Sequence, residues 1–309
     1  MSTSRFSPRR ELGRTGFVAT MLGAGDLADR SVPLESCVTT LRRALDAGLN
    51  VVDTAPSYED GYSEEIVGRA LEDRREGIFL IDKLDHFDRA VLPQVEASLE
   101  RLRTAPDLFV FHGVSTLEAW DTLAKPGGRF EELEAVVAAG KARFRGISSH
   151  HPDVLARAIP SGLCDVVMFP IGPFVDVRYV EETLPLARRH GVGSVCFKTF
   201  GAGKLLGDTS GYGRPLDARP RGKLSSGGVD RDAAAGLTRL SVAECLNYTL
   251  SCDPDVTLLG LSFPNEQDAA FAAAEAFSGR LAPAALAELR ARARDAMEGK
   301  GAAWWNPPA

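Results

Sequence analysis

The sequence predicts a single (β/α)8 barrel, a TIM barrel, spanning residues 1–309. Eight short apolar runs recur along the chain, and amphipathic stretches separate them. Most runs are apolar on both faces, which is typical of parallel strands covered by helices. Eight such units in a chain of this length match the usual size of a barrel, and no break in composition indicates a second domain.

The expected strands begin with the apolar run that starts at Phe17. In order they are "FVATMLGAG", "NVVDTA", "GIFLIDK", "DLFVFHG", "ARFRGISS", "DVVMFPI", "GSVCFKTF" and "TLLGLS". The main alternative, a doubly wound sheet, needs a glycine-rich phosphate turn after an early strand. "GAGDLAD" follows the first run, but it lacks the third glycine of that motif, which favours the barrel.

Helical patterns lie between these strands. "PLESCVTTLRRALDAG" places Val38, Leu41 and Leu45 on one face and ends at Gly48. "SEEIVGRALEDRR" is expected to begin at Ser63 as its N-cap. The same periodicity predicts helices in "RAVLPQVEASLERLR", "RFEELEAVVAAG", "PDVLARAI", "VEETLPLARRHG" and "SVAECLNYTLSC".

Two segments fall outside the repeat. Residues 207–236, rich in Gly, Arg and Asp, are expected to form a long mobile loop. An Ala-rich extra helix near residues 283–297 precedes the C-terminal tail "WWNPPA". The paired indoles of Trp304 and Trp305 are expected to pack onto the barrel because their apolar surface is large.

Composition argues against several classes of protein. The net charge of −6 argues against a broad nucleic-acid or anionic-membrane surface. Apolar runs stay shorter than the roughly 18 residues of a membrane helix, and the N-terminus does not resemble a signal peptide. Five scattered cysteines without a CxxC pair favour reduced thiols and a cytoplasmic location.

The expected strand ends carry the residues with chemical potential. The second strand ends in Asp53, and Tyr58 lies in the loop after it. The third ends in Lys83 and the fourth in His112. Because active sites of such barrels form at the C-terminal strand ends, these four side chains are expected to converge on one mouth.

Their combination suits proton transfer to a carbonyl oxygen. Hydride addition to a carbonyl leaves an alkoxide that needs a proton, and a phenol with a pKa near 10 is a poor acid alone. A lysine cation beside Tyr58 makes proton donation easier, and a carboxylate keeps that lysine charged. An imidazole can hold the carbonyl oxygen in line.

Each residue alone has a simpler structural explanation. Asp53 could cap a turn, Tyr58 could pack, and Lys83 could be a solvated strand end. A single histidine such as His112 is more often a hydrogen-bonded core residue. A Schiff-base aldolase using Lys83 is a further alternative, although Asp53 would keep the amine charged. Histidine spacing does not indicate a metal site.

The sequence resembles the aldo-keto reductase family over nearly its whole length. "ELGRTGFVATMLGAG" is similar to the family's N-terminal hairpin and first strand, and "NVVDTAPSYEDGYSEEIVGRAL" to its Asp–Tyr segment. "LIDKL", "DLFVFHG" and "RGISS" resemble its Lys, His and nicotinamide-binding strands. The resemblance implies an NAD(P)H-dependent oxidoreductase that reversibly reduces an aldehyde or ketone. It also implies Tyr58 as general acid, Lys83 and Asp53 as its tuning residues, and His112 to orient the substrate.

The resemblance further implies a cofactor site with several departures from the family pattern. Ser149 stands where the family usually has Asn, Met168 where it usually has Gln, and Gly172 where an Asn is common. "SFPNEQ" lacks the Arg that often grips a 2′-phosphate. NADPH is expected as cofactor, with NADH also accepted. The expected cofactor-binding residues are Gly25, Asp26, Ser148, Ser149, Met168, Phe197, Lys198, Thr199, Gly201, Gly203, Gly260, Ser262 and Gln267.

These departures leave a second functional class open, a weakly catalytic or non-catalytic cofactor-binding scaffold or regulatory subunit on the same fold. The complete Asp–Tyr–Lys–His set favours the enzyme. The expected partner is a small carbonyl or alcohol, whose identity depends on loops that vary freely on this fold.

Overall fold

The computed structural model describes residues 4–25, 30, 32–207, 238–260, 264–298, 300, 303 and 305–306. Almost all of the predicted 207–236 loop lies outside these residues, as do Asp26, Ser262 and Trp304.

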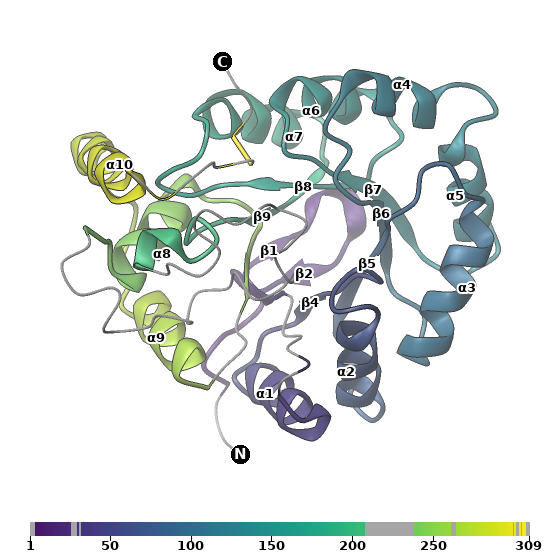
Figure 1. Cartoon of the computed structure of the whole chain (residues 1–309), viewed down its shortest axis with the longest axis horizontal. Coiled ribbons are helices and arrows are strands. Elements are labelled where there is room, and N and C mark those ends of the chain that lie inside the picture. The colour runs from purple at the N-terminus through teal and green to yellow at the C-terminus, as the bar shows by residue number, and fades with distance from the viewer. Residues whose placement is uncertain are drawn as a thin grey trace.

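Eight parallel strands close into a barrel in the order β10-β3-β4-β5-β6-β7-β8-β9, which confirms the predicted fold (Figure 1). The first four are β3 (Leu22–Ala24), β4 (Val51–Asp53), β5 (Phe79–Leu84) and β6 (Leu108–Phe111). They are followed by β7 (Phe144–Ser148), β8 (Val166–Pro170), β9 (Gly193–Phe197) and β10 (Val256–Leu259).

Helices cover the outside of the barrel (Figure 1). They are α1 (Leu34–Asp46), α2 (Tyr62–Leu71), α3 (Val91–Leu102), α4 (Leu117–Ala124), α5 (Arg129–Ala138), α6 (Pro152–Ala158), α7 (Leu184–Arg189), α8 (Val242–Cys252), α9 (Pro264–Glu275) and α10 (Pro283–Met297). The helices α4 and α9 were not among the sequence predictions. Helix α10 confirms the expected extra helix.

The predicted N-cap of α2 is wrong. The cap residue is Gly61, in the left-handed region with φ of 84°, and Ser63 lies one residue inside the helix. The Ser63 hydroxyl instead accepts a 2.8 Å hydrogen bond from the Thr54 hydroxyl. This buried bond ties the start of α2 to the end of β4.

The first apolar run is divided between two sheets. Its beginning forms β2 (Val18–Ala19), which pairs antiparallel with β1 (Arg10–Glu11), and its end forms the barrel strand β3. This hairpin closes one end of the barrel. Leu12 packs against Gly193 at the start of β9, and the Phe17 and Phe79 rings lie 5.1 Å apart.

The apolar core has two layers because strand residues alternate between the two faces of the barrel wall. Inside the barrel, the packed side chains include Val51, Phe79, Leu108, Val166 and Val256. A larger layer lies between the strands and the helices. The barrel is therefore filled, and chemistry is confined to its open end.

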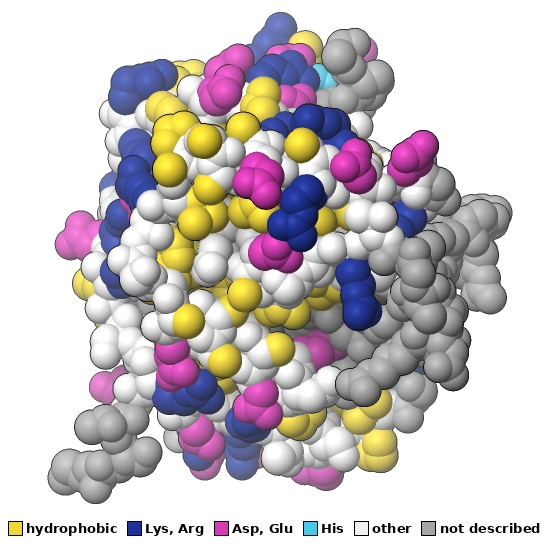
Figure 2. Space-filling view, turned by 90° about the vertical axis from the view of Figure 1, so that its left-hand side faces the viewer, with side chains coloured by type: hydrophobic (Ala, Val, Ile, Leu, Met, Phe, Trp, Pro, Cys, Tyr) yellow, Lys and Arg dark blue, Asp and Glu magenta, His cyan; other side chains and the backbone are white. Residues whose placement is uncertain are grey.

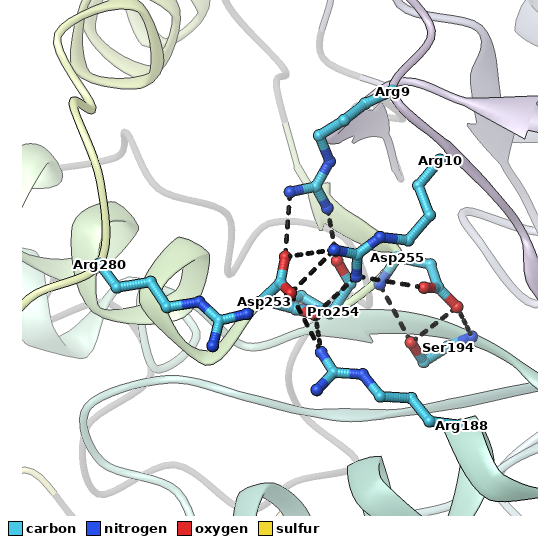
Figure 3. Close-up of polar contacts among 8 residues, drawn as sticks. All are labelled: Arg9, Arg10, Arg188, Ser194, Asp253, Pro254, Asp255 and Arg280. Atoms are coloured by element: carbon cyan, nitrogen blue, oxygen red, sulfur yellow. Dashed lines mark hydrogen bonds and ion pairs between the residues drawn. The ribbon is translucent and has the colours of Figure 1, made fainter.

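A carboxylate surrounded by arginines joins several elements at the start of β10 (Figure 3). Asp253, the C-cap of α8, lies 2.8 Å from Arg10 and 3.0 Å from Arg9. Arg280 approaches it to 2.5 Å and Arg188 to 3.3 Å. Since these arginines come from the hairpin, from α7 and from the segment before α10, Asp253 links four parts of the chain.

The C-terminal segment packs onto the barrel, as expected for Trp305. Its side chain is fully buried, and its indole N–H donates to the Phe174 carbonyl at 3.4 Å. Asn306 donates to the same carbonyl at 3.2 Å. On the face that carries α8, α9 and α10, small apolar groups are interspersed with charges of both signs (Figure 2). Within the described ranges, no helix is both long and apolar enough to cross a membrane.

Candidate active site

Polar side chains collect at the C-terminal ends of the barrel strands, where the apolar interior stops. Asp53 and Lys83 continue the inward-facing rows of Val51 and Ile81, two residues further along each strand. His112 directly follows β6, and its N–H donates to the Leu84 carbonyl of β5 at 3.0 Å. The strand pairing therefore brings these three residues together, as the sequence predicts.

Lys83 and Asp53 form a buried ion pair. The Lys83 Nζ lies 2.6 Å from Asp53 Oδ1 and 2.6 Å from the Thr54 carbonyl oxygen, and both side chains are only 2% exposed. Burial alone would lower the pKa of Lys83, but Asp53 and Tyr58 together raise it above its ordinary value. Lys83 therefore stays a cation at neutral pH, which argues against a Schiff-base nucleophile.

Tyr58 lies over this pair. Its ring centroid is 4.5 Å from the Lys83 Nζ and 5.7 Å from the His112 ring, which meets it edge-on. The following residues Glu59, Asp60 and Gly61 all have positive φ, from 50° to 84°. Since non-glycine residues rarely adopt this conformation, the tight reversal before α2 fixes how the chain presents Tyr58.

Asp85 is a residue of the site that the sequence analysis missed. It follows β5, and its carboxylate lies 2.5 Å from His112 Nδ1. The same carboxylate accepts from the backbone N–H and the hydroxyl of Ser57, each at 2.9 Å. The sequence feature that could have identified Asp85 as a site residue is its position two residues after Lys83, at the end of a strand.

The expected nicotinamide-side residues lie on β7 and β8. Ser148 and Met168 are paired neighbours and both are buried. The Ser148 hydroxyl accepts from the Gly113 N–H at 2.8 Å, and the Ser149 hydroxyl contacts the His151 backbone at 3.1 and 3.3 Å. Met168 contributes a thioether to the barrel interior. The serine hydroxyls are thus already engaged with neighbouring loops, although each can make further bonds.

The segment after β9 carries several other expected cofactor residues. The Lys198 Nζ lies 5.9 Å from the Phe197 ring centroid and 5.6 Å from the Trp305 ring. Thr199 is buried, and its hydroxyl oxygen has no hydrogen-bond partner among the described residues. The N–H groups of Gly201 and Gly203 donate within this loop, to Lys198 and Phe200.

Gly172 is explained by packing against this segment. A Cβ at this position would lie 2.6 Å from the Lys198 carbonyl oxygen, which is closer than real Cβ contacts. Where the family pattern often has Asn, this chain therefore has a backbone-to-backbone approach that excludes any larger side chain.

The remaining expected residues lie around β10. The Gly25 N–H donates to the Leu259 carbonyl of β10 at 2.7 Å, next to Gly260. Gln267 is buried in α9, donates to the Thr40 carbonyl at 2.7 Å and accepts from Arg43 at 3.1 Å. Gln267 thus binds α1, an outcome that the sequence analysis did not foresee.

Comparison with known proteins agrees with this arrangement. The model of the Aldo/keto reductase family matches residues 20–269. The chain belongs to the aldo/keto reductase family. The Asp53, Tyr58, Lys83 and His112 positions lie inside the matched range.

Individual relatives within this family are distant. An uncharacterized oxidoreductase of Bacillus subtilis (strain 168) is 30% identical over 60% of this chain and 63% of its own length. An NADH-specific methylglyoxal reductase of Escherichia coli (strain K12) is 26% identical over 63% of this chain and 66% of its own. Both matches thus span less than two thirds of the relative. The holo form of an aldo-keto reductase from Bacillus halodurans has a TM-score of 0.67 and 26% identity, covering 93% of this chain and 95% of that one.

Within the part of the chain that the structure describes, no group of three or more His, Cys, Asp or Glu side chains could hold a metal ion. The polarising charge near Tyr58 comes from Lys83.

Proposed function

We propose that the protein reversibly reduces an aldehyde or ketone to an alcohol with NADPH, with Tyr58 as the general acid. The observation that carries this proposal is the contact of the Tyr58 ring with the buried Lys83, whose pKa is raised by Asp53 and Tyr58. A cation there favours the phenolate that remains after proton donation, so it lowers the cost of transferring the phenol proton.

The roles of the other side chains follow from their contacts. Asp53 neutralises Lys83 and fixes its position through the 2.6 Å ion pair. His112, whose side chain is 16% exposed, lies edge-on to Tyr58 at the mouth of the barrel. Its Nε2 can bind the carbonyl oxygen that receives the Tyr58 proton, and in the reverse direction Tyr58 accepts the alcohol proton.

The residues near β9 suit a nicotinamide cofactor, which supplies the hydride when bound. Phe197 offers an aromatic surface and Lys198 offers a cation. The buried Thr199 hydroxyl, which has no hydrogen-bond partner among the described residues, offers a polar group. Ser148 and Ser149 can bind an amide at the neighbouring strand end. Together these side chains provide the stacking, charge and hydrogen-bonding groups that the cofactor needs.

Only a modest preference for NADPH over NADH is expected. Near the start of α9, Arg43 from α1 donates to the Pro264 carbonyl at 3.0 Å, but Asp268 already pairs with it at 2.5 Å. Because a carboxylate neutralises this cation, we expect a preference of about tenfold, or about 1.4 kcal/mol. Fluorescence titration with both reduced cofactors measures this ratio, and a preference on the order of a thousandfold would reveal a stronger phosphate clamp.

A carbonyl panel tests the proposed reaction. The panel contains simple aldehydes, ketones and methylglyoxal, because one relative is named a methylglyoxal reductase. Each is mixed with NADPH or NADH, and absorbance of the reduced nicotinamide is followed. Carbonyl-dependent loss of absorbance is the expected result. Cofactor binding without turnover of any carbonyl or alcohol would instead support the non-catalytic scaffold.

A further inference from the structure

Asp85 connects two groups that the proposed function uses separately. Its carboxylate binds the His112 imidazole at 2.5 Å and the Ser57 hydroxyl and N–H at 2.9 Å. Ser57 directly precedes Tyr58, and His112 follows the next strand. The Asp85 carboxylate therefore contacts both the loop that carries Tyr58, the proposed general acid, and the His112 imidazole that faces Tyr58.

The charge of Asp85 determines which atom of His112 carries hydrogen. Partial burial would raise the pKa of Asp85, but the bonds from His112 and Ser57 together hold that pKa well below its ordinary value. An ionised carboxylate has no hydrogen to donate, so Nδ1 of His112 must be the donor. This leaves Nε2 as the nitrogen that can meet a substrate.

Other titratable groups also face His112. Asp53, at the end of β4, interacts with it electrostatically but is already paired with Lys83. His150, from the loop after β7, is partly buried, and burial together with the charges of Lys198 and His112 lowers its pKa, so it stays neutral. Among these groups, Asp85 is the carboxylate in direct hydrogen-bond contact with the imidazole.

We propose that Asp85 is a positioning residue that holds His112 as an imidazolium for carbonyl reduction and thereby sets the pH above which reduction declines. This inference rests on the proposed carbonyl chemistry. An imidazolium keeps hydrogen on both nitrogens, so Nε2–H donates to a carbonyl oxygen. Neutral His112 keeps its hydrogen on Nδ1, toward Asp85, and its bare Nε2 cannot donate to the carbonyl oxygen. Reduction therefore declines as His112 loses its proton.

The first test measures His112 without any turnover. Imidazole nitrogen signals are followed by NMR against pH in the wild-type protein, in Asp85→Asn and in Asp88→Asn. Asp88 is an exposed aspartate of the same loop and provides a control with the same change of charge. The His112 signals are assigned by their loss in His112→Asn. Because an adjacent opposite charge favours the charged form by about 1–3 pH units, Asp85→Asn should lower the His112 titration midpoint by at least about one unit. Asp88→Asn should leave it unchanged.

The second test asks whether turnover follows this titration. With a carbonyl from the panel, the alkaline limit of kcat for reduction should move to lower pH in Asp85→Asn by the same interval as the NMR midpoint. An unchanged midpoint, or a uniform loss of kcat at every pH, would overturn the positioning role. Since the NMR titration needs no substrate, a wild-type protein that turns over no carbonyl would refute the proposed function while leaving the effect of Asp85 on His112 measurable.

Discussion

Replacing Lys83 by Met is predicted to destabilise the fold strongly, and to do so more at high pH. The substitution leaves Asp53, whose side chain is 2% exposed, without the cation that lies 2.6 Å away. An uncompensated buried charge costs about 3–5 kcal/mol. Burial already raises the pKa of Asp53, and Lys83 is the first of the groups that oppose this effect. Without Lys83, the folded-state pKa of Asp53 should rise further above its unfolded value of about 3.9.

The sign of the pH dependence follows from this shift. A carboxyl group whose pKa is raised in the folded state favours folding below the unfolded pKa, and this stability is lost as pH rises through the folded pKa. The penalty should therefore be small at pH 5 and large at pH 8, changing by at most about 1.4 kcal/mol per pH unit. The free energy of unfolding in urea, measured at both pH values, tests this expectation.

Two further variants control the experiment. Lys141, whose partner Glu96 is 3.4 Å away, is a partly exposed lysine, and Lys141→Met should cost less than about 1 kcal/mol. Adding Asp53→Asn to Lys83→Met should recover most of the lost stability because it removes the stranded charge. Equal stability of Lys83→Met and wild type at pH 8, or an equal loss at both pH values, would refute the reasoning.

The other predictions concern stability and the cofactor site. Asp253→Asn should lower the free energy of unfolding by about 1–2 kcal/mol because four partly exposed arginines lose their shared carboxylate. Burial would raise the pKa of Asp253, but Arg10 and its neighbours lower it, so wild type should lose this contribution as pH falls below about 4 while the variant should not. Trp305→Ala removes a fully buried indole and should cost about 3 kcal/mol in the same assay; an unchanged value would mean that the tail does not pack in solution. Gly172→Ala should weaken NADPH binding by about tenfold, measured by fluorescence titration, because its Cβ displaces the Lys198 carbonyl; undiminished affinity would show that this segment does not contact the cofactor.

The barrel could be predicted from sequence because its signal is repeated. Each strand is a short apolar run followed by a helix, and an error in one element does not change the class of fold. The divided first run shows the limit of this reasoning. An apolar pattern indicates that residues are buried but not which sheet they join. Ala19 and Leu22 are both buried, yet they lie in different sheets although their sequence signal is continuous.

Apart from Tyr58, which lies in a loop, the positions of the catalytic candidates could be predicted only for residues that stand at the ends of strands. Asp53, Lys83 and His112 are fixed by register, so their convergence followed from the fold. Asp85 was missed because its role depends on contacts across two loops, which spacing does not reveal. Spacing likewise did not reveal that Gln267, an expected cofactor residue, donates to the Thr40 carbonyl of α1.

The phenol of Tyr58 provides the most direct test of the account. We predict that Tyr58→Phe lowers kcat for carbonyl reduction by at least about 100-fold, the usual contribution of a general acid, while NADPH affinity stays near that of wild type. Tyr62→Phe is the matched control, because the Tyr62 hydroxyl donates to the Val32 carbonyl at 2.9 Å and so serves the fold. Its turnover should be close to normal. Near-normal carbonyl reduction by Tyr58→Phe would contradict the assignment of Tyr58 as the acid.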